Sequence, residues 1–235
     1  MSEFLHGAKA LGLYLMPAAI IMLSSRKLFK IPDELFRKIL HFILLGAYIP
    51  FLFAFENWWC SVAFAASLMV LLFPVLSLAQ KIPMFSSFVN ERKKGEFRSS
   101  MVLAIGVIIF SISICWGLFK DKYLVLACVY AWGVGDAFAA LIGKKFGKHK
   151  IKMKLADNKK SIEGSLAMIV TSALSVFTVL MVRGGIGVLP SLLIALLAAV
   201  ACTFVELCTK DGLDTVTCPA TAMVIIIPLV KLLGV

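Results

Sequence analysis

Eight stretches of this chain are apolar along most of their length, and short polar segments separate them. A helix needs about 20 apolar residues to cross the hydrocarbon core of a bilayer, and these stretches reach or approach that length. The pattern therefore predicts an all-α fold: a polytopic integral membrane helix bundle, one domain over residues 1–235, with about eight transmembrane helices, or seven if the first does not cross. The stretches are residues 10–24, 36–55, 58–79, 99–119, 123–142, 164–181, 186–207 and 218–233.

The first stretch is the shortest of the eight, and the charges around it bear on whether it is retained. Glu3 and Lys9 precede the stretch, whereas Arg26 and Lys27 follow it. A secretory signal peptide carries its positive charge before the apolar run, so this order predicts a retained helix.

Basic residues gather on one side of the predicted bundle. Of the 24 Lys and Arg residues, 19 lie in or beside the connections at 25–35, 80–98, 143–163 and 208–217. Cytoplasmic loops of membrane proteins collect Lys and Arg, so we expect these connections in the cytoplasm and both termini outside. The membrane would be the cell membrane in a prokaryote and the endoplasmic reticulum in a eukaryote, with any active site on these connections facing the cytoplasm.

Composition supports the membrane assignment and removes one class of partner. Hydrophobic residues make up 61% of the chain and charged residues 16%, whereas soluble proteins average about 45–50% and about 25%. A soluble fold of this size could not bury so much apolar surface. The net charge of +11 follows from the loop asymmetry, so we expect no nucleic-acid partner. The six cysteines lie mostly in apolar runs without a C-x-x-C pair, which indicates packing residues.

Asp136 is the acid placed deepest in a predicted span, within the fifth apolar stretch. An acid at mid-helix costs about 2.5–3.5 kcal/mol on insertion scales, so its presence indicates a function. Gly133, Ala139, Ala140 and Gly143 share its helical face, which leaves space for a ligand or for Mg²⁺. The alternative is close helix packing around these small residues, with Asp136 paired to a buried Lys or Arg.

The connection at 143–163 is the most basic loop of the chain, with eight lysines. Gly143, Lys144 and Gly147 suit close approach of the backbone to phosphate, although the segment lacks the Gly-Lys-Ser/Thr of a P-loop. Taken alone, the loop is more simply explained as a solvated basic face near anionic lipid.

The residues that lead into the sixth stretch combine helix-start signals with positive charge. Ser161 suits a helix N-cap, and Glu163, next to Gly164, suits the first turn. These roles explain both residues without a function. Free backbone N–H groups at a helix start, with Lys159 and Lys160 beside them, also make an anion site.

Three further polar clusters lie on the same predicted side of the membrane. They are Arg37, Lys38 and His41; Glu91, Arg92 and Glu96; and Glu206 with Asp214. The first could be an ordinary basic flank, and Glu206 could simply pair with Lys210 one turn later. Together they supply what a Mg²⁺–nucleotide needs, namely oxygen ligands for the metal and cations for the phosphates.

These clusters, in this order, resemble the membrane CTP-dependent lipid kinases: dolichol kinase, phytol kinase and the CTP-using diacylglycerol kinase. The matching elements are Arg37-Lys38-x-x-His41, Glu91-Arg92-x-x-Gly95-Glu96, Gly135-Asp136-x-x-Ala139-Ala140-x-x-Gly143-x-x-x-Gly147, Lys160-Ser161-x-Glu163-Gly164-Ser165 and Glu206…Asp214…Pro219. They extend over about residues 37–219. The last element departs from the family pattern, in which Asp-Asn often precedes an apolar pair and Pro, because Thr215 follows Asp214 here.

The resemblance implies an enzyme that phosphorylates the hydroxyl of a membrane lipid alcohol, with CTP as donor and Mg²⁺ as cofactor. The acceptor would be a polyprenol or dolichol, a phytol-like isoprenoid or diacylglycerol. Asp136 would bind Mg²⁺ or position the hydroxyl, with Glu206 as a further metal ligand. Arg37, Lys38 and Lys160 would hold phosphate charge. The expected partners are the lipid alcohol, CTP and the bilayer, and the sequence indicates no particular oligomeric state.

Two other functions stay open at this point. The Asp–Gly–Lys–Glu–Gly part of the pattern also resembles phosphatidate cytidylyltransferase, which makes CDP-diacylglycerol. The His-Gly-Gly…Asp-Arg signature of that family is absent, because His149 is the last histidine. A small membrane transporter would also carry an intramembrane acid, but it would be expected to show repeated halves, and the polar clusters gather at one face instead.

Overall fold

The structure is a computed structural model that describes residues 2–29, 31–79, 96–151, 160–209 and 212–233. Over these residues the chain is helical, and the one β-type contact is an isolated antiparallel bridge between Lys150 and Ser161. Eight helices are long and apolar enough to cross a membrane. The fold class predicted from the hydropathy pattern is therefore confirmed.

The helices follow one another with short connections. They are α1 (Ser2–Leu28), α2 (Asp33–Phe53), α3 (Trp58–Ala79), α5 (Glu96–Ser111), α6 (Lys122–Phe146), α7 (Ile162–Arg183), α8 (Val188–Cys208) and α9 (Asp214–Leu233). Residues Ile112–Leu118 continue α5 as the π-helix η1, so the fourth spanning segment is built from two kinds of helix.

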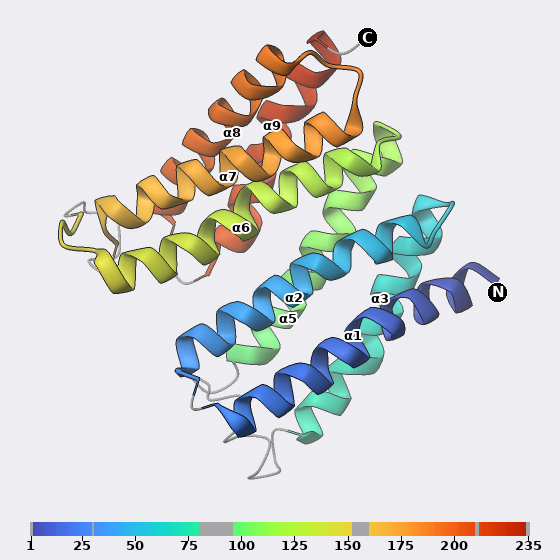
Figure 1. Cartoon of the computed structure of the whole chain (residues 1–235). Coiled ribbons are helices and arrows are strands. Elements are labelled where there is room, and N and C mark those ends of the chain that lie inside the picture. The colour runs from blue at the N-terminus through green and yellow to red at the C-terminus, as the bar shows by residue number, and fades with distance from the viewer. Residues whose placement is uncertain (1, 30, 80–95, 152–159, 210–211, 234–235) are drawn as a thin grey trace.

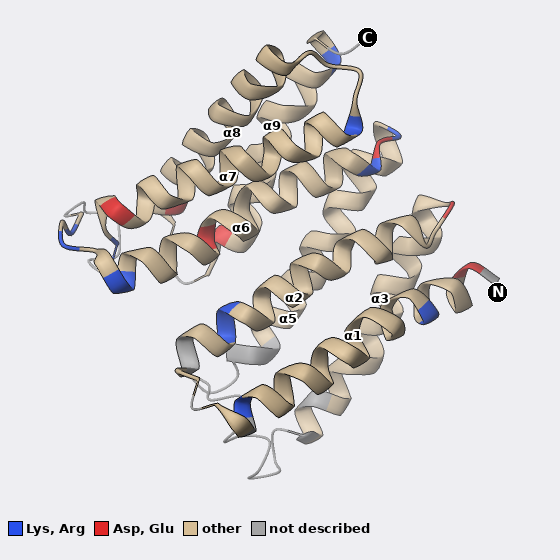
Figure 2. Cartoon of the chain, in the orientation of Figure 1, with Lys and Arg blue, Asp and Glu red and all other residues tan. Residues whose placement is uncertain are grey.

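Helix α6 lies at the centre of the bundle, where it contacts α2, α7, α8, α9 and η1. Figure 1 shows α6 to α9 packed as one group, with α1, α2 and α3 beside it. Both termini lie at one end of the bundle, whereas α1, α3, α6 and α8 finish at the other (Figure 1). Lys and Arg mark the end of α6 and the start of α2 at this second end (Figure 2). We call it the loop end.

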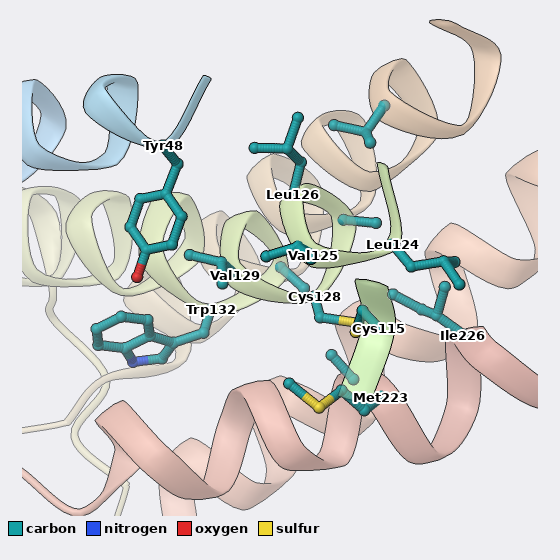
Figure 3. Packing of buried hydrophobic residues seen from close by; sticks show 14 of the residues in the cluster. Tyr48, Cys115, Leu124, Val125, Leu126, Cys128, Val129, Trp132, Met223 and Ile226 are labelled. Carbon is teal, nitrogen blue, oxygen red and sulfur yellow. The ribbon is translucent and has the colours of Figure 1, made fainter. Parts of the chain in front are cut away.

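The buried core surrounds α6 and is apolar. Leu124 and Cys128 of α6 are fully buried and pack with Cys115 of η1 and with Met223 and Ile226 of α9 (Figure 3). Lipid tails are as apolar as these side chains, so close packing, and not removal from water, holds such helices together. The outer faces of α1, α3 and α8 expose large apolar side chains, as lipid-facing helices do. Five of the six cysteines are buried and all six are free, which agrees with a packing role.

Two helices differ in length from the predicted stretches. Helix α1 begins at Ser2 and has 27 residues, so the stretch predicted to be shortest forms the longest helix described. Its polar first turns are helical although they lie outside the apolar pattern. Helix α6 continues to Phe146, which places Gly143 and Lys144 inside the helix and not in the loop predicted to begin at 143. Lysines suit the last turn of a helix, because they complement its dipole.

Candidate functional site

An ion pair between α2 and α6 forms the polar centre of the site. Lys38 Nζ donates to Asp136 Oδ2 at 2.7 Å, across 98 positions of sequence. The Lys38 side chain is 9% exposed and that of Asp136 is 24% exposed. Asp136 therefore has the buried cationic partner that the packing interpretation requires, and its side chain is not fully buried by this contact.

The next turn of each helix holds this pair in register. Because α2 and α6 run antiparallel, the turn after Lys38 meets the turn before Asp136. There, Nε2 of His41 lies 3.0 Å from the carbonyl oxygen of Gly133, and since a carbonyl only accepts, this nitrogen carries the proton. Leu45 packs against the same glycine, where an added Cβ would lie 2.5 Å from a Leu45 methyl carbon. Gly133 therefore lets α2 approach α6 closely enough for the ion pair to form.

Trp132 extends the site to α9. Its Nε1 donates to Oδ2 of Asp214 at 3.1 Å, and its ring stands edge-on to His41 with ring centroids 5.6 Å apart. Asp214 is the first residue of α9. The sequence indicates His41 and Asp214 but not Trp132, because a Trp inside an apolar run carries no sign that it donates to an acid.

Lys160 is held by the last turn of α8. Its Nζ lies 2.9 Å from Oε1 of Glu206, and it also donates to the main-chain carbonyls of Glu206 and of Thr209, the latter at 3.2 Å. A cation is favourable there, because the last carbonyls of a helix lack intrahelical partners and carry the negative end of its dipole. Glu206 thus pairs with a residue 46 positions earlier. Lys210, its alternative partner from the sequence, lies outside the described residues.

Three carboxylates from different helices act on one another in this region. Asp136, Glu206 and Asp214 are close enough for their negative charges to interact. Lys38 and Lys160 each form an ion pair with one of them. The positive charges of Lys38 and Arg37 both act on Asp136. We call Asp136, Glu206, Asp214, Lys38 and Lys160 the charged network; it joins α2, α6, α8 and α9 at the loop end.

The charged network has the donor chemistry of a Mg²⁺ site but does not form a complete one. Among the residues that the structure describes, no three His, Cys, Asp or Glu side chains are arranged to hold a metal ion by themselves. Mg²⁺ is usually bound through one or two carboxylates together with substrate phosphates. Asp136 and Glu206 therefore fit the requirement of a Mg²⁺–nucleotide, and their metal role stays a prediction.

The described ends of the connection between α6 and α7 meet at the isolated antiparallel bridge between Lys150 and Ser161. Ser161 caps α7, with its Oγ accepting from the Gly164 N–H at 3.2 Å, as its position in the sequence predicts. Glu163 turns to His149, whose Nδ1 lies 2.7 Å from Oε1 of the acid. Glu163 therefore bonds to His149 of the same connection, and its place in the phosphate site stays a prediction. The sequence pattern does not indicate this role of His149.

The glycines at this end serve the contact between α6 and α7. A Cβ on Gly164 would lie 2.9 Å from the Ala139 carbonyl oxygen and 3.3 Å from Cα of Gly143. A Cβ on Gly147 would overlap the Gly143 carbonyl oxygen and lie 2.6 Å from Oγ of Ser161. Small residues allow such backbone contact. The space beside Gly143 and Gly147 where a side chain would lie is therefore filled by Ser161 and α7, and approach of phosphate to their backbone stays a prediction.

The remaining predicted site residues divide into two groups. Arg37 and Lys144 are exposed at the start of α2 and the end of α6. The second group lies outside the described residues or has an undescribed side chain: Glu91, Arg92, Lys159 and Glu96, the last at the start of α5.

Eight helices long and apolar enough to span a membrane, with a charged network at their loop end, define an integral membrane protein with a polar site at that end. Residues 5–209 match the cytidylyltransferase family, and because this match covers most of the chain, the chain belongs to that family. It is also similar to a phytol kinase from Synechocystis sp., with 27% identity over 226 residues that cover 89% of this chain and 87% of the relative. No solved structure matches the chain. The resemblance to CTP-dependent lipid kinases is thereby confirmed.

Proposed function

We propose that the chain is a CTP-dependent kinase that transfers the γ-phosphate of CTP to the hydroxyl of a membrane lipid alcohol. Similarity to a phytol kinase supports a lipid alcohol as acceptor, and membership of the cytidylyltransferase family supports a cytidine nucleotide as donor. The observation that carries the proposal is the Lys38–Asp136 pair, in which a partly exposed acidic side chain lies beside a buried lysine.

The proposed chemistry relies on positioning and charge, which supply most of phosphoryl-transfer catalysis. Asp136 accepts the proton of the acceptor hydroxyl and directs its oxygen at the γ-phosphorus. The new O–P bond forms as the bond to the bridging oxygen breaks, and CDP leaves. Lys38 and Arg37 supply positive charge that stabilises the transferring phosphoryl group.

The proposed nucleotide site lies beside Asp136 at the loop end. Glu206 would hold Mg²⁺, which when bound neutralises phosphate charge, and Asp136 would be a second metal ligand in the alternative in which it does not act on the hydroxyl. Lys144 and Lys160 would add positive charge, Lys160 while it is paired with Glu206 at the end of α8, and the role of Lys159, outside the described residues, stays a prediction. Because cytoplasmic loops collect Lys and Arg, we assign this face to the cytoplasm.

The acceptor would reach the site by lateral movement in the bilayer. Asp136 lies ten residues before the end of α6, or about 15 Å at 1.5 Å per residue. Lys38 lies five residues after the start of α2. Lys38 is near the start of its helix, whereas Asp136 lies in the half of α6 toward the loop end, at a depth that a lipid hydroxyl would have to reach while its chain stays among the tails. Polyprenol, a phytol-like isoprenoid and diacylglycerol all satisfy this requirement.

A second candidate follows from the description of the family. A cytidylyltransferase would join the whole cytidylyl group of CTP to phosphatidate and release pyrophosphate. The same cations and carboxylates would serve this reaction, because it also moves a phosphoryl centre. The missing His-Gly-Gly…Asp-Arg signature favours the kinase.

The position of the label separates the two reactions. Purified protein in detergent is given CTP labelled at the γ- or the α-phosphate, with Mg²⁺ and either lipid alcohols or phosphatidate. The kinase transfers γ-label to an alcohol and leaves α-label in CDP. Transfer of α-label to phosphatidate identifies the cytidylyltransferase. Reactions without acceptor and with Asp136→Asn protein are the controls, and no transfer from either position contradicts both functions.

A further inference from the structure

Trp132 is a buried residue with a polar N–H group, and the proposed chemistry does not use it. It is 8% exposed and lies one turn before Asp136 on α6. An indole N–H can only donate, and a buried donor needs an acceptor. The acceptor is the carboxylate of Asp214, 3.1 Å away on α9. The contact therefore links the helix that carries the central acid to another member of the charged network.

The orientation of Trp132 is fixed by its neighbours. The ring packs edge-on against His41, with an angle of 86° between the ring planes. His41 is itself held by the Gly133 carbonyl, at 3.0 Å. One face of α2 thus braces the indole from one side, and Asp214 receives its N–H. Because the indole ring of Trp132 is fixed in this way, it can hold the Asp214 carboxylate in one orientation.

Asp214 needs such a donor because of the charges around it. Its carboxylate lies within electrostatic reach of Asp136, and it also acts on Glu206. Mutual repulsion would favour turning the Asp214 side chain away or neutralising it. The Trp132 N–H offsets this repulsion and keeps the carboxylate turned toward α6.

We propose that Trp132 is a positioning residue for nucleotide binding: it holds the Asp214 carboxylate in the charged network, beside Asp136, where Mg²⁺–CTP binds. This inference rests on the proposed use of CTP. It assigns Asp214 to the nucleotide and not to the lipid acceptor, and it assigns Trp132 no contact with the reacting atoms. Because the Trp132 N–H donates to Asp214, replacing Trp132 should change nucleotide binding through Asp214 alone.

The test is a double-mutant cycle on binding of Mg²⁺–CTP, measured by titration calorimetry on the full chain in detergent. Trp132→Phe removes the N–H and keeps a ring against His41. We expect it to weaken binding about five- to tenfold and Asp214→Ala to weaken binding at least as much. The double variant should bind no more weakly than Asp214→Ala alone, because coupled residues are not additive.

Tyr130→Phe is the matched control. Tyr130 also lies on α6 and donates from its hydroxyl to α2, at the Leu45 carbonyl 3.1 Å away, so this hydrogen bond does not involve Asp214. Tyr130→Phe removes one hydroxyl donor from an aromatic ring two positions before Trp132. Its binding of Mg²⁺–CTP should stay within twofold of that of the wild type. Additive losses in the cycle would mean that Trp132 only supports the fold, and would overturn the proposal.

A second measurement covers the case in which Trp132→Phe does not fold. The chain has four Trp residues, so indole ¹⁵N–¹H spectra of the labelled protein contain few signals. Asp214→Asn should move one of them, and Mg²⁺–CTP should move the same one in the wild type. If no signal responds to both changes, the proposal is wrong.

These outcomes are separable from those of the kinase assay. Coupled binding losses without γ-label transfer would leave the Trp132 assignment standing and remove the kinase. If Trp132→Phe binds Mg²⁺–CTP normally while the wild type transfers the γ-label, the kinase proposal stands and the role proposed for Trp132 is wrong.

Discussion

Lys160 and Glu206 form an ion pair, at 2.9 Å, that fastens the connection between α6 and α7 to the end of α8. The lysine also donates to two main-chain carbonyls there. One side chain therefore closes a helix end and anchors the most basic loop of the chain. Its charge is already shared when a nucleotide arrives, which makes its stabilising role testable apart from catalysis.

Replacing Lys160 should destabilise the protein more than replacing its acidic partner. Lys160→Met removes the ion pair and both carbonyl contacts, whereas Glu206→Gln removes only the charge of one acceptor. Hydrogen bonds to charged groups contribute about 1.5–3 kcal/mol each, and for a chain of this size each kcal/mol corresponds to about 2–4 °C. Thermal unfolding in detergent should show a loss for Lys160→Met several degrees larger than for Glu206→Gln. Equal losses would mean that the carbonyl contacts contribute nothing.

Asp136→Asn should lower the rate of label transfer by at least about 100-fold, which is the usual contribution of a general base. It also leaves the buried Lys38 ammonium without its partner, which lowers stability. The double variant Lys38→Met/Asp136→Leu separates the two effects, because an apolar pair can replace a buried ion pair without loss of stability. We expect it to unfold near the wild-type temperature and to be inactive in the label-transfer assay. Full activity of Asp136→Asn would exclude the carboxylate from the mechanism.

Alanine substitutions at the loop-end glycines should be tolerated in a definite order. A Cβ on Gly143 would lie 3.2 Å from Ser161 Oγ, which a small shift relieves, whereas a Cβ on Gly147 would overlap a backbone carbonyl. Gly143→Ala should therefore be produced in nearly normal yield and Gly147→Ala should not, as measured by monodisperse protein after purification. Gly12→Ala is the control, because nothing lies within 4 Å of its added Cβ. Equal yields for Gly143→Ala and Gly147→Ala would contradict the packing at this end.

Cysteine labelling tests which ends of the bundle share a side of the membrane. Single cysteines at Ser2 and Lys148, introduced with Cys208→Ser, should react with a membrane-impermeant maleimide from opposite sides. Position 148 should label from the cytoplasmic side, because basic loops stay there. The other native cysteines are buried and should stay unreactive. Labelling of both positions from one side would contradict the topology.

The spanning helices could be predicted because membrane length is a local property of the sequence. An apolar run of sufficient length is visible without knowing its neighbours. Lys38 and Asp136 could be found for a related reason, since charge inside such a run is costly and therefore informative. The structure adds their contact, because only the packing of α2 against α6 brings together two residues 98 positions apart.

The pairing of residues far apart could not be read from the sequence. Glu206 has Lys210 within one turn, yet its partner is Lys160, because the packing of α7 and α8 brings the loop to that helix end. Gly143 and Gly147 suit both phosphate approach and helix contact, and only the position of α7 shows the second role. Trp132 is hidden for the same reason, since its acceptor belongs to another helix.

The charged network occupies one end of the bundle, while at the other end Arg183 is paired with Asp121. A lipid phosphorylated at the loop end gains a group that carries about −1.5 to −2 charges at neutral pH. Charge crosses hydrocarbon only at high cost, whereas a neutral alcohol passes between the two leaflets far more readily. Chemistry confined to one end would therefore trap its product in a single leaflet, and the two halves of the bilayer would become different in composition without any transport step.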